Sequence, residues 1–379
     1  MAGRVTIQDI ADELGVSRNT VSKAINNTGI LADATRERIL QKAVEMGYKQ
    51  FSYVSLTNIS SDNTASDVSA PLLTLSTEEN TVQDTPPEAP SSRAAGNIAL
   101  FTTMFLGNSH FASTMLDKVQ RELASIKYSL TIHLINKYEL ENTLLPYSFD
   151  KEATSGIMCI EVFDPAYSDM ICSLGLPVLF VDSYAHICSS PLKADRLLMD
   201  NRTNIYCFIK EMADRGKKRI GFIGEYLHCL SFFERYMGYR EALITLNLPC
   251  KEEYSILGNK EGVKYPTSED YREYLTDVIK NLRELPDVFI CANDFIALDV
   301  LQAFNRLGIS VPKDVYLCGF DDSSESRITT PPLTTIHIHS QIMGFTAVHL
   351  LISRIKEPGL NYRTVHTETS LIYRESTED

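Results

Sequence analysis

The chain has 379 residues, a formal net charge of −13 and a hydrophobic content of 44%. This length suits two or three domains. No apolar run reaches the roughly 20 residues that a membrane-spanning helix needs. The N-terminus leads into an amphipathic pattern instead of the apolar core of a signal peptide. We therefore expect a cytoplasmic protein with no membrane partner.

The first predicted element is a short amphipathic helix. Its apolar stripe at helical spacing consists of Ile7, Ile10, Ala11 and Leu14. Thr6 precedes the stripe and Asp9 follows three residues later, which is the pattern of a capping box. Gly15 and Val16 then predict a tight turn.

A second helix is expected to begin at Ser17, with an inward face formed by Val21, Ala24 and Ile25. A third helix is expected from about 33 to 46, with a buried side formed by Ile39, Leu40, Ala43 and Val44. Two short helices around a tight turn, with a supporting third, predict a helix-turn-helix.

The polar residues around the start and outer face of the second helix suggest its role. They are Ser17, Arg18, Asn19, Thr20, Ser22 and Lys23. Arg and Lys match guanine edges, Asn matches adenine, and small hydroxyls suit phosphates. The alternative is a three-helix bundle whose polar face is only solvated. Because the turn, the caps, the apolar stripe and the polar face agree, we favour DNA binding.

The segment resembles the headpiece of the lactose-repressor (LacI/GalR-type) family of bacterial transcription regulators. The matching stretches are Val5-Thr6-Ile7, Asp9-Ile10-Ala11, Gly15-Val16-Ser17, Thr20-Val21-Ser22, Asn26, Thr35-Arg36 and Gly47-Tyr48. The resemblance implies that Arg18, Asn19 and Lys23 read bases. It implies phosphate contacts for the hydroxyl residues Ser17, Thr20 and Ser22.

The acidic net charge does not argue against DNA binding, because it lies outside this headpiece, which we place at residues 1–50. The headpiece holds seven of the 36 Lys and Arg residues and six of the 49 Asp and Glu residues. It is therefore slightly basic, and the excess of acid belongs to the remaining residues.

Residues 51–95 are predicted to form a flexible linker, because they are rich in Ser, Thr, Pro and acidic residues and poor in large apolar ones. The family follows its third helix with a hinge helix that inserts a Leu into the minor groove. The corresponding positions here hold Gln50, Phe51, Val54, Ser55 and Thr57. Minor-groove insertion is therefore not expected from the resemblance.

From residue 96 to 379, apolar strands alternate with helical patterns. Strands are predicted at 98–101, 130–135, 156–162, 178–181, 219–223, 288–291 and 316–320. Helices are predicted near 115–126 and at 202–215, 232–246, 268–283 and 294–307. Repeated β-α units predict parallel sheets covered by helices. The units are too many for one sheet, so we expect two α/β lobes with a cleft at the carboxyl ends of the strands.

Several polar residues follow the predicted strands or begin the next helix: Asp182, Arg235, Asn293 and Asp321. Carboxylates, an amide and a guanidinium that converge on a cleft would suit a polyhydroxylated ligand. Each residue also has a simpler interpretation, because an Asp at the end of a strand usually caps the next helix.

This body is similar to the effector domain of the same family, which has the fold of type I periplasmic sugar-binding proteins. The matching stretches are 108–111, 200–201, 218–224, the segment around Arg235, 291–297, 319–322 and 332–336. The resemblance implies effector contacts at Asp182, Arg235, Asn293 and Asp321, with Phe111 stacking on the ligand. It also implies that helix 340–357 returns to the first lobe, that strand 365–372 returns to the second, and that two bodies dimerise.

We therefore predict an all-α helix-turn-helix headpiece joined to a two-lobed α/β effector domain. The predicted protein is a regulator, expected to be a repressor, that binds operator DNA as a homodimer and responds to a sugar-like effector. It would associate with the nucleoid when bound to DNA. A ligand-binding module without a transcriptional role is the alternative. We expect no enzyme activity or cofactor, because the chain lacks a G-x-G-x-x-G, a P-loop and a G-x-S-x-G motif. We expect no metal and no disulfide framework, because the eight cysteines are scattered and no two have C-x-x-C spacing.

Overall fold

The computed structural model describes residues 5–25, 35, 38–39, 42–43, 46, 95–104, 110–185, 191–258 and 268–378. The chain divides into two compact units, residues 1–87 and 88–379. The predicted linker, residues 51–95, lies outside the described residues except for its last residue.

The N-terminal unit begins with two short helices, α1 (Ile7–Leu14) and α2 (Arg18–Ile25). The predicted capping box is present, because Thr6 accepts a hydrogen bond from the Asp9 amide and Asp9 accepts one from the Thr6 amide. Gly15 ends α1 with a φ of 65°, a left-handed conformation that glycine adopts without strain. The tight turn is therefore where the sequence predicted it.

The core of this unit is formed by buried apolar residues from the predicted stripes: Ile10, Ala11, Val21, Ala24, Ile39 and Ala43. Ile39 and Ala43 come from the predicted third helix, most of which lies outside the described residues. Their burial against α1 and α2 agrees with a supporting role for that segment.

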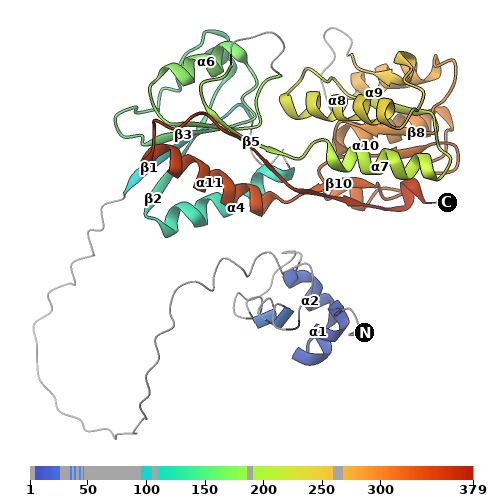
Figure 1. Cartoon of the computed structure of the whole chain (residues 1–379), viewed down its shortest axis with the longest axis horizontal. Coiled ribbons are helices and arrows are strands. Elements are labelled where there is room, and N and C mark those ends of the chain that lie inside the picture. The colour runs from blue at the N-terminus through green and yellow to red at the C-terminus, as the bar shows by residue number, and fades with distance from the viewer. Residues whose placement is uncertain are drawn as a thin grey trace, which may run out of the picture. The chain divides into compact units, whose positions relative to one another are not determined.

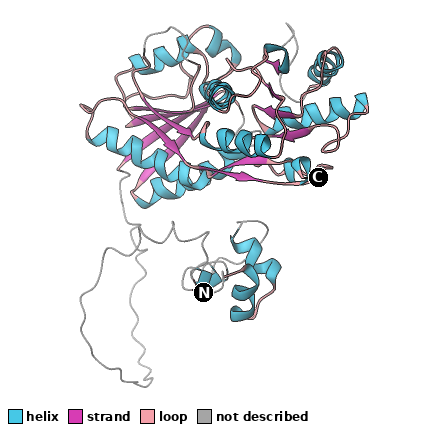
Figure 2. Ribbon diagram, turned by 45° about the vertical axis from the view of Figure 1, so that its right-hand side comes forward, coloured by secondary structure: helices cyan, strands magenta, loops and turns pink. Residues whose placement is uncertain are grey.

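The first lobe contains a six-stranded parallel sheet (Figures 1 and 2). Its strands, in spatial order, are β11 (Thr364–Thr367), β5 (Asp195–Met199), β4 (Val178–Val181), β3 (Gly156–Ile160), β1 (Gly96–Thr102) and β2 (Tyr128–Leu134). Alternate residues face opposite sides of a strand. In β1, Ile98 and Leu100 therefore pack toward α4 (His110–Ser125), and Ala99 and Phe101 toward α6 (Pro165–Ser173).

The helices of this lobe lie on both faces of the sheet. In Figure 1, α4 and α11 (Ser340–Lys356) lie on one side, and α6 lies on the other. A short helix, α5 (Lys137–Glu141), follows β2. Because α11 packs against α4, β3, β4 and β5, the prediction that helix 340–357 returns to the first lobe is confirmed.

The second lobe contains a four-stranded parallel sheet and a two-stranded antiparallel sheet. The first consists of β7 (Ser255–Ile256), β6 (Ile220–Ile223), β8 (Val288–Cys291) and β9 (Tyr316–Cys318), and the second of β10 (Thr335–Ile338) and β12 (Thr369–Ile372). Four helices lie where the sequence predicted them: α7 (Thr203–Asp214), α8 (Leu230–Thr245), α9 (Glu269–Lys280) and α10 (Asp294–Leu307). Helix α7 packs with α8, and α9 with α10. Short 3-10 helices occur at Glu252–Tyr254, Glu325–Arg327 and Glu375–Thr377.

The chain passes between the lobes three times, after β5, after β10 and after β11. The prediction that strand 365–372 belongs to the second lobe is wrong for its first half. Residues 364–367 form β11, which pairs with β5 in the first lobe, and only β12 pairs with β10 in the second. The physical reason is β5, an unpredicted strand whose outer edge is available for pairing.

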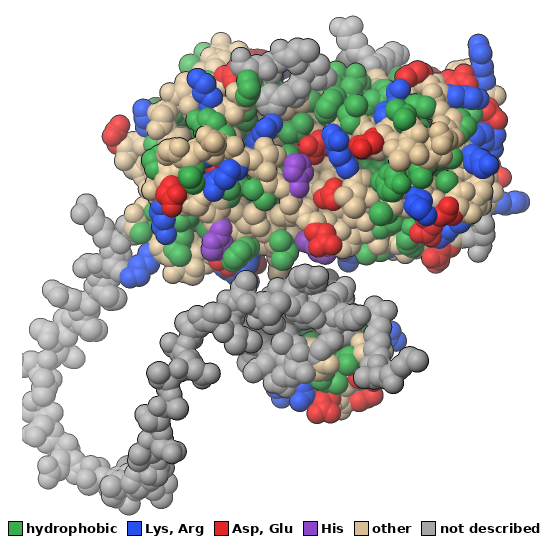
Figure 3. All heavy atoms as spheres, viewed as in Figure 1, with side chains coloured by type: hydrophobic (Ala, Val, Ile, Leu, Met, Phe, Trp, Pro, Cys, Tyr) green, Lys and Arg blue, Asp and Glu red, His purple; other side chains and the backbone are tan. Residues whose placement is uncertain are grey.

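Charged side chains of both signs are interspersed on the face of the body that Figure 3 shows. The excess of acid is therefore not gathered into a single patch on that face. Within the described ranges, no helix is long and apolar enough to cross a lipid bilayer.

Asp195, the first residue of β5, holds the C-terminal part of the first lobe. Its fully buried carboxylate accepts bonds from Arg354 of α11 at 2.8 Å and from the Arg363 side chain at 2.7 Å. It also accepts the Arg363 amide at 2.8 Å. Burial opposes ionisation of Asp195, but the bonds from Arg354 and Arg363 outweigh it and hold its pKa below the usual value.

We predict that Asp195→Asn destabilises the protein by about 3 kcal/mol, because removing one member of a buried ion pair leaves the other charges uncompensated. Urea unfolding followed by circular dichroism would measure this. The control is Asp214→Asn, which removes the exposed pair with Lys210 and should cost about 0–1 kcal/mol. Equal effects of the two substitutions would contradict the role of Asp195.

The same carboxylate predicts a pH dependence. A lowered pKa in the folded state contributes stability above the unfolded value of 3.8, and this contribution disappears as the pH falls through the folded value. The stability difference between the wild type and Asp195→Asn should therefore shrink as the pH falls below about 5. A difference that stays constant down to pH 3 would argue against an ionised Asp195 in the folded protein.

Candidate functional site

The polar face predicted to read DNA lies on and just before α2. The Ser17 hydroxyl accepts the Thr20 amide at 3.0 Å and lies 2.7 Å from the Thr20 hydroxyl, so Ser17 caps the helix as expected. Arg18 and Asn19 follow in the first turn, and both are exposed. Their side chains therefore lie at the positively polarised end of the helix, where phosphates are attracted.

The other predicted contacts occupy the same helix. Ser17 is exposed, and Thr20, Ser22 and Lys23 are half-buried. Val21 and Ala24, which alternate with them, are buried in the core of the unit. The sequence of α2 thus separates an apolar inner side from a polar outer side, as a helix that enters a groove requires.

The predicted effector residues centre on Arg235 in α8, which is only 2% exposed. Its guanidinium lies 3.5 Å from the Asp321 carboxylate and 3.5 Å above the centre of the Phe320 ring. Both partners follow β9, so the strand end brings an aromatic ring and a carboxylate to the same cation.

Two further bonds hold the guanidinium in place. The Nε–H of Arg235 donates to the Asn201 side-chain oxygen at 2.9 Å, and Nη1 donates to the Ala292 carbonyl at 2.6 Å. Ala292 directly follows β8, and Asn201 lies in the segment that joins the two lobes. Arg235 is therefore held from three separate parts of the chain.

Asp321 lies in an unusual environment for a carboxylate. Burial raises its pKa to about 8, and the carboxylates of Asp294, Glu161 and Asp182 add to this effect, whereas Arg235 opposes it. At neutral pH the carboxyl group is mostly protonated. It can then donate one hydrogen bond and accept others, which is a suitable pattern for a ligand hydroxyl.

Asp182 contacts backbone amides of both lobes. It follows β4 in the first lobe, and one carboxylate oxygen accepts the amides of Ser183 at 2.7 Å and Ser231 at 3.1 Å. Ser231 lies in the first turn of α8, whose N-cap residue Cys229 provides no side-chain cap. Asp182 therefore caps a helix of the other lobe.

Asn293 follows the simpler interpretation, because it caps the next helix. Its side-chain oxygen accepts the Ile296 amide at 3.0 Å at the start of α10. Phe111 belongs to α4, and its side chain lies outside the described part of the structure. Of the five predicted effector residues, Arg235 and Asp321 thus contact each other, and Asp182 and Asn293 cap helices.

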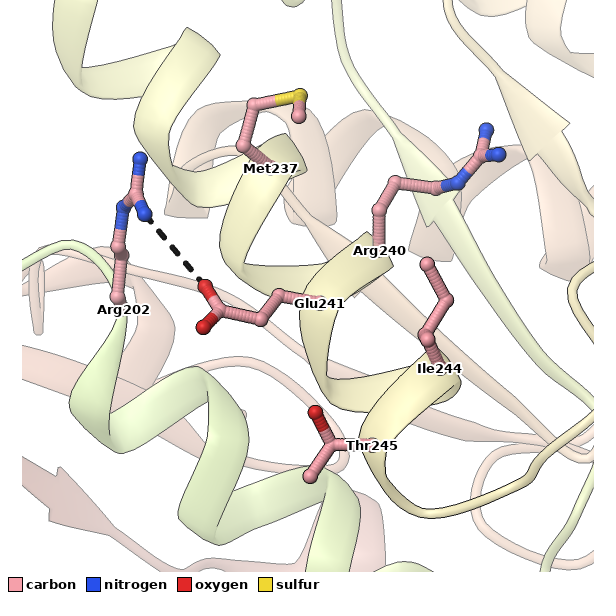
Figure 4. A pocket seen from close by; sticks show the side chains of 6 residues that line it. All are labelled: Arg202, Met237, Arg240, Glu241, Ile244 and Thr245. Carbon is pink, nitrogen blue, oxygen red and sulfur yellow. Dashed lines mark hydrogen bonds and ion pairs between the residues drawn. The ribbon is translucent and has the colours of Figure 1, made fainter.

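Asn201 and Phe320 are functional candidates that the sequence reasoning did not single out. Both belong to stretches that matched the family, but nothing in their local pattern indicated contact with Arg235. A separate cavity of about 270 Å³ lies on the outer side of α8 (Figure 4). Its lining residues, which are distinct from the predicted effector contacts, are Arg202, Met237, Arg240, Glu241, Ile244 and Thr245.

The histidines and cysteines have structural surroundings. His337 lies on β10 and bonds to Asp322 at 2.9 Å, and His339 bonds to Ser370 at 2.9 Å. No group of three or more His, Cys, Asp or Glu side chains within the described ranges could hold a metal ion. Four cysteines there are buried thiols, whereas Cys207 and Cys250 are exposed.

Comparison with known families agrees with this architecture. Residues 6–50 match the family model of bacterial regulatory proteins of the lacI family, and residues 209–377 match the model of a periplasmic binding protein-like domain. The first match covers the helix-turn-helix. The second covers most of the second lobe, together with α11 and β11 of the first lobe.

Relatives match along nearly the whole chain. The HTH-type transcriptional repressor PurR of Mannheimia succiniciproducens is 27% identical over 98% of both chains, and that of Vibrio parahaemolyticus is 25% identical over 98% of both.

Solved structures share the fold. The regulator CelR in complex with cellobiose has a TM-score of 0.63 and 21% identity, and the match covers 98% of this chain and all of the other. The lac repressor dimer bound to operator and the anti-inducer ONPF has a TM-score of 0.61 and 19% identity, with full coverage of both chains. With its matching headpiece, its periplasmic-binding-protein-like body and these full-length relatives, the chain belongs to the lacI family of bacterial regulatory proteins.

Proposed function

We propose that the protein is a transcriptional repressor that binds operator DNA through α2 and is controlled by a small molecule bound at Arg235 and Asp321. The observation on which the regulatory part rests is the buried Arg235–Asp321 pair beneath the ends of β8 and β9. A polar ligand could form hydrogen bonds to both the Arg235 guanidinium and the protonated Asp321 carboxyl, because the two groups lie next to each other inside the body.

The DNA-binding half is supported by the exposed side chains of α2 and by the relatives. The PurR relatives are repressors, and the lac repressor was solved as a dimer on its operator. We infer that this protein also binds as a homodimer, since two headpieces on a pseudo-palindrome double the number of contacts. The cytoplasm, where the nucleoid lies, is the compartment that this function requires.

For the effector, we propose a polyhydroxylated small molecule such as a sugar. Arg235 only donates hydrogen bonds, the protonated Asp321 both donates and accepts, and the side-chain amide of Asn293 lies at the adjacent strand end. Such a set matches hydroxyl groups, which also do both. CelR, a protein of the same fold, was solved with cellobiose. The contacts predicted for Asp182 and Phe111 stay predictions.

The proposed mechanism is a difference in ligand affinity between two arrangements of the lobes. A ligand that prefers one arrangement shifts the population toward it, and the dimer then favours or disfavours operator binding. Such a mechanism needs no direct contact between ligand and DNA.

We predict that Arg18→Ala weakens operator binding by about 1–3 kcal/mol, because a bidentate contact to a base contributes that much discrimination. Gel-shift titrations at one fixed salt concentration would compare DNA from upstream of the protein's own gene with a scrambled duplex. The control, Arg121→Ala, removes an exposed arginine of α4 and should leave the preference unchanged. Unaltered discrimination by Arg18→Ala would remove Arg18 from the base-reading set.

We predict that Asp321→Ala abolishes the effector response and leaves DNA binding intact, because Asp321 belongs to the proposed effector site and not to the helix-turn-helix. A thermal-shift screen of monosaccharides and disaccharides, cellobiose included, would first identify a ligand of the wild type. Gel shifts with that sugar would then compare Asp321→Ala with Asp277→Ala, which removes an exposed carboxylate of α9. A normal response by Asp321→Ala would contradict the site, and a screen without any stabilising sugar would contradict the ligand class.

A further inference from the structure

Asn201 lies between the lobes, in a turn whose shape is fixed by hydrogen bonds of its neighbours. It lies in the segment between β5 and α7 and is 1% exposed. The preceding Asp200 accepts the amides of Arg202 at 2.9 Å and Thr203 at 3.0 Å, which shapes the turn. Asn201 is thereby directed at α8.

The Asn201 side chain bridges two consecutive residues of α8. Its oxygen accepts the Arg235 Nε–H at 2.9 Å, and its nitrogen donates to the Glu234 carboxylate at 2.8 Å. An arginine only donates and an ionised carboxylate only accepts, so these neighbours dictate the orientation of the amide. The amide of Asn201 supplies both the acceptor and the donor that these two neighbours require.

Glu234 extends the network to a second passage between the lobes. Its carboxylate lies 3.3 Å from the Nε2 of His366 on β11, next to the segment that leads into β12. The side chains of Glu234 and Arg235 are therefore bonded to one segment that joins the lobes, at Asn201, and to the strand that precedes another. A movement of these parts of the chain would be transmitted to α8 through these hydrogen bonds.

The bond to Asn201 determines what the Arg235 guanidinium can do. With Nη1 bonded to Ala292 and its plane above Phe320, the group could still turn about the Nη1 bond. A second bond at Nε restricts this rotation and keeps Nη1 within 3.5 Å of the Asp321 carboxyl group. The two bonds and the contact with the Phe320 ring together define the orientation of the planar group.

We propose that Asn201 is a positioning residue of the effector site, which orients Arg235 toward Asp321 and ties that orientation to the segments between the lobes. The inference deepens the proposed function and rests on it for the role of Arg235. Its test needs no ligand, so it can fail independently of the sugar screen.

The experiment uses the full-length protein labelled with ¹⁵N-arginine and measures hydrogen exchange at the Arg235 Nε–H by NMR. The signal is assigned by its loss in Arg235→Lys. In Asn201→Leu the acceptor is absent, and exchange at this group should become at least tenfold faster. In Asn201→Asp an acceptor remains, and exchange should stay within about threefold of the wild type, since the loss of one hydrogen bond corresponds to about a tenfold effect.

Stability provides the second measurement. Asn201→Asp places a carboxylate against Glu234 and should lower the melting temperature, whereas adding Glu234→Gln supplies a donor and should restore it. A merely structural role predicts that Nε–H exchange follows stability through this series. The positioning role predicts that exchange follows the presence of an acceptor at position 201.

Arg202→Gln is the matched control, because it alters the adjacent exposed residue and its contact with Glu241 at 3.5 Å without touching Arg235 (Figure 4). It should change neither exchange nor stability appreciably. Slow Nε–H exchange in Asn201→Leu, or exchange that tracks melting temperature in all variants, would overturn the proposal.

Discussion

The buried charge of Arg235 is the constraint on which the proposed effector site depends. Removing a guanidinium from water costs several kcal/mol unless its donors and its charge are matched. Here an amide, a carbonyl, an aromatic ring and the carboxyl group of Asp321 surround the guanidinium. They come from the ends of β8 and β9 and from the segment after β5, so the two-lobed fold is what assembles the surroundings of this one residue.

Much of the fold was predictable because its signals are local. The capping box of Thr6, the turn at Gly15 and the alternating strands of the body are visible within a few residues. The strand β5 was missed because it begins with Asp195 and Arg196, which read as a loop. Asp195 is buried only because Arg354 and Arg363, about 160 residues later, satisfy its carboxylate, and no local pattern records that partnership.

In the candidate site, too, local contacts could be predicted from the sequence and contacts between distant residues could not. Asn293 caps the helix that follows it, as the usual behaviour of strand-end residues predicts. Asp182 also caps a helix, but that helix is α8 of the other lobe, 49 residues away in sequence. Arg235 and Asp321 were each expected to contact the effector from family resemblance. Their contact with each other, and the bonds of Asn201, depend on residues that meet only in the folded chain.

Helix α8 makes hydrogen bonds to the first lobe and to a segment that joins the lobes. Its first turn bonds to Asp182 and Ser183 of the first lobe, and its next turn bonds to Asn201 and approaches His366. A rearrangement that moves α8 relative to the first lobe would therefore change these bonds. A ligand changes an equilibrium only through contacts that differ between the two states. Because Arg235 lies within this set of bonds, a ligand that binds the guanidinium would sense the arrangement of the lobes directly.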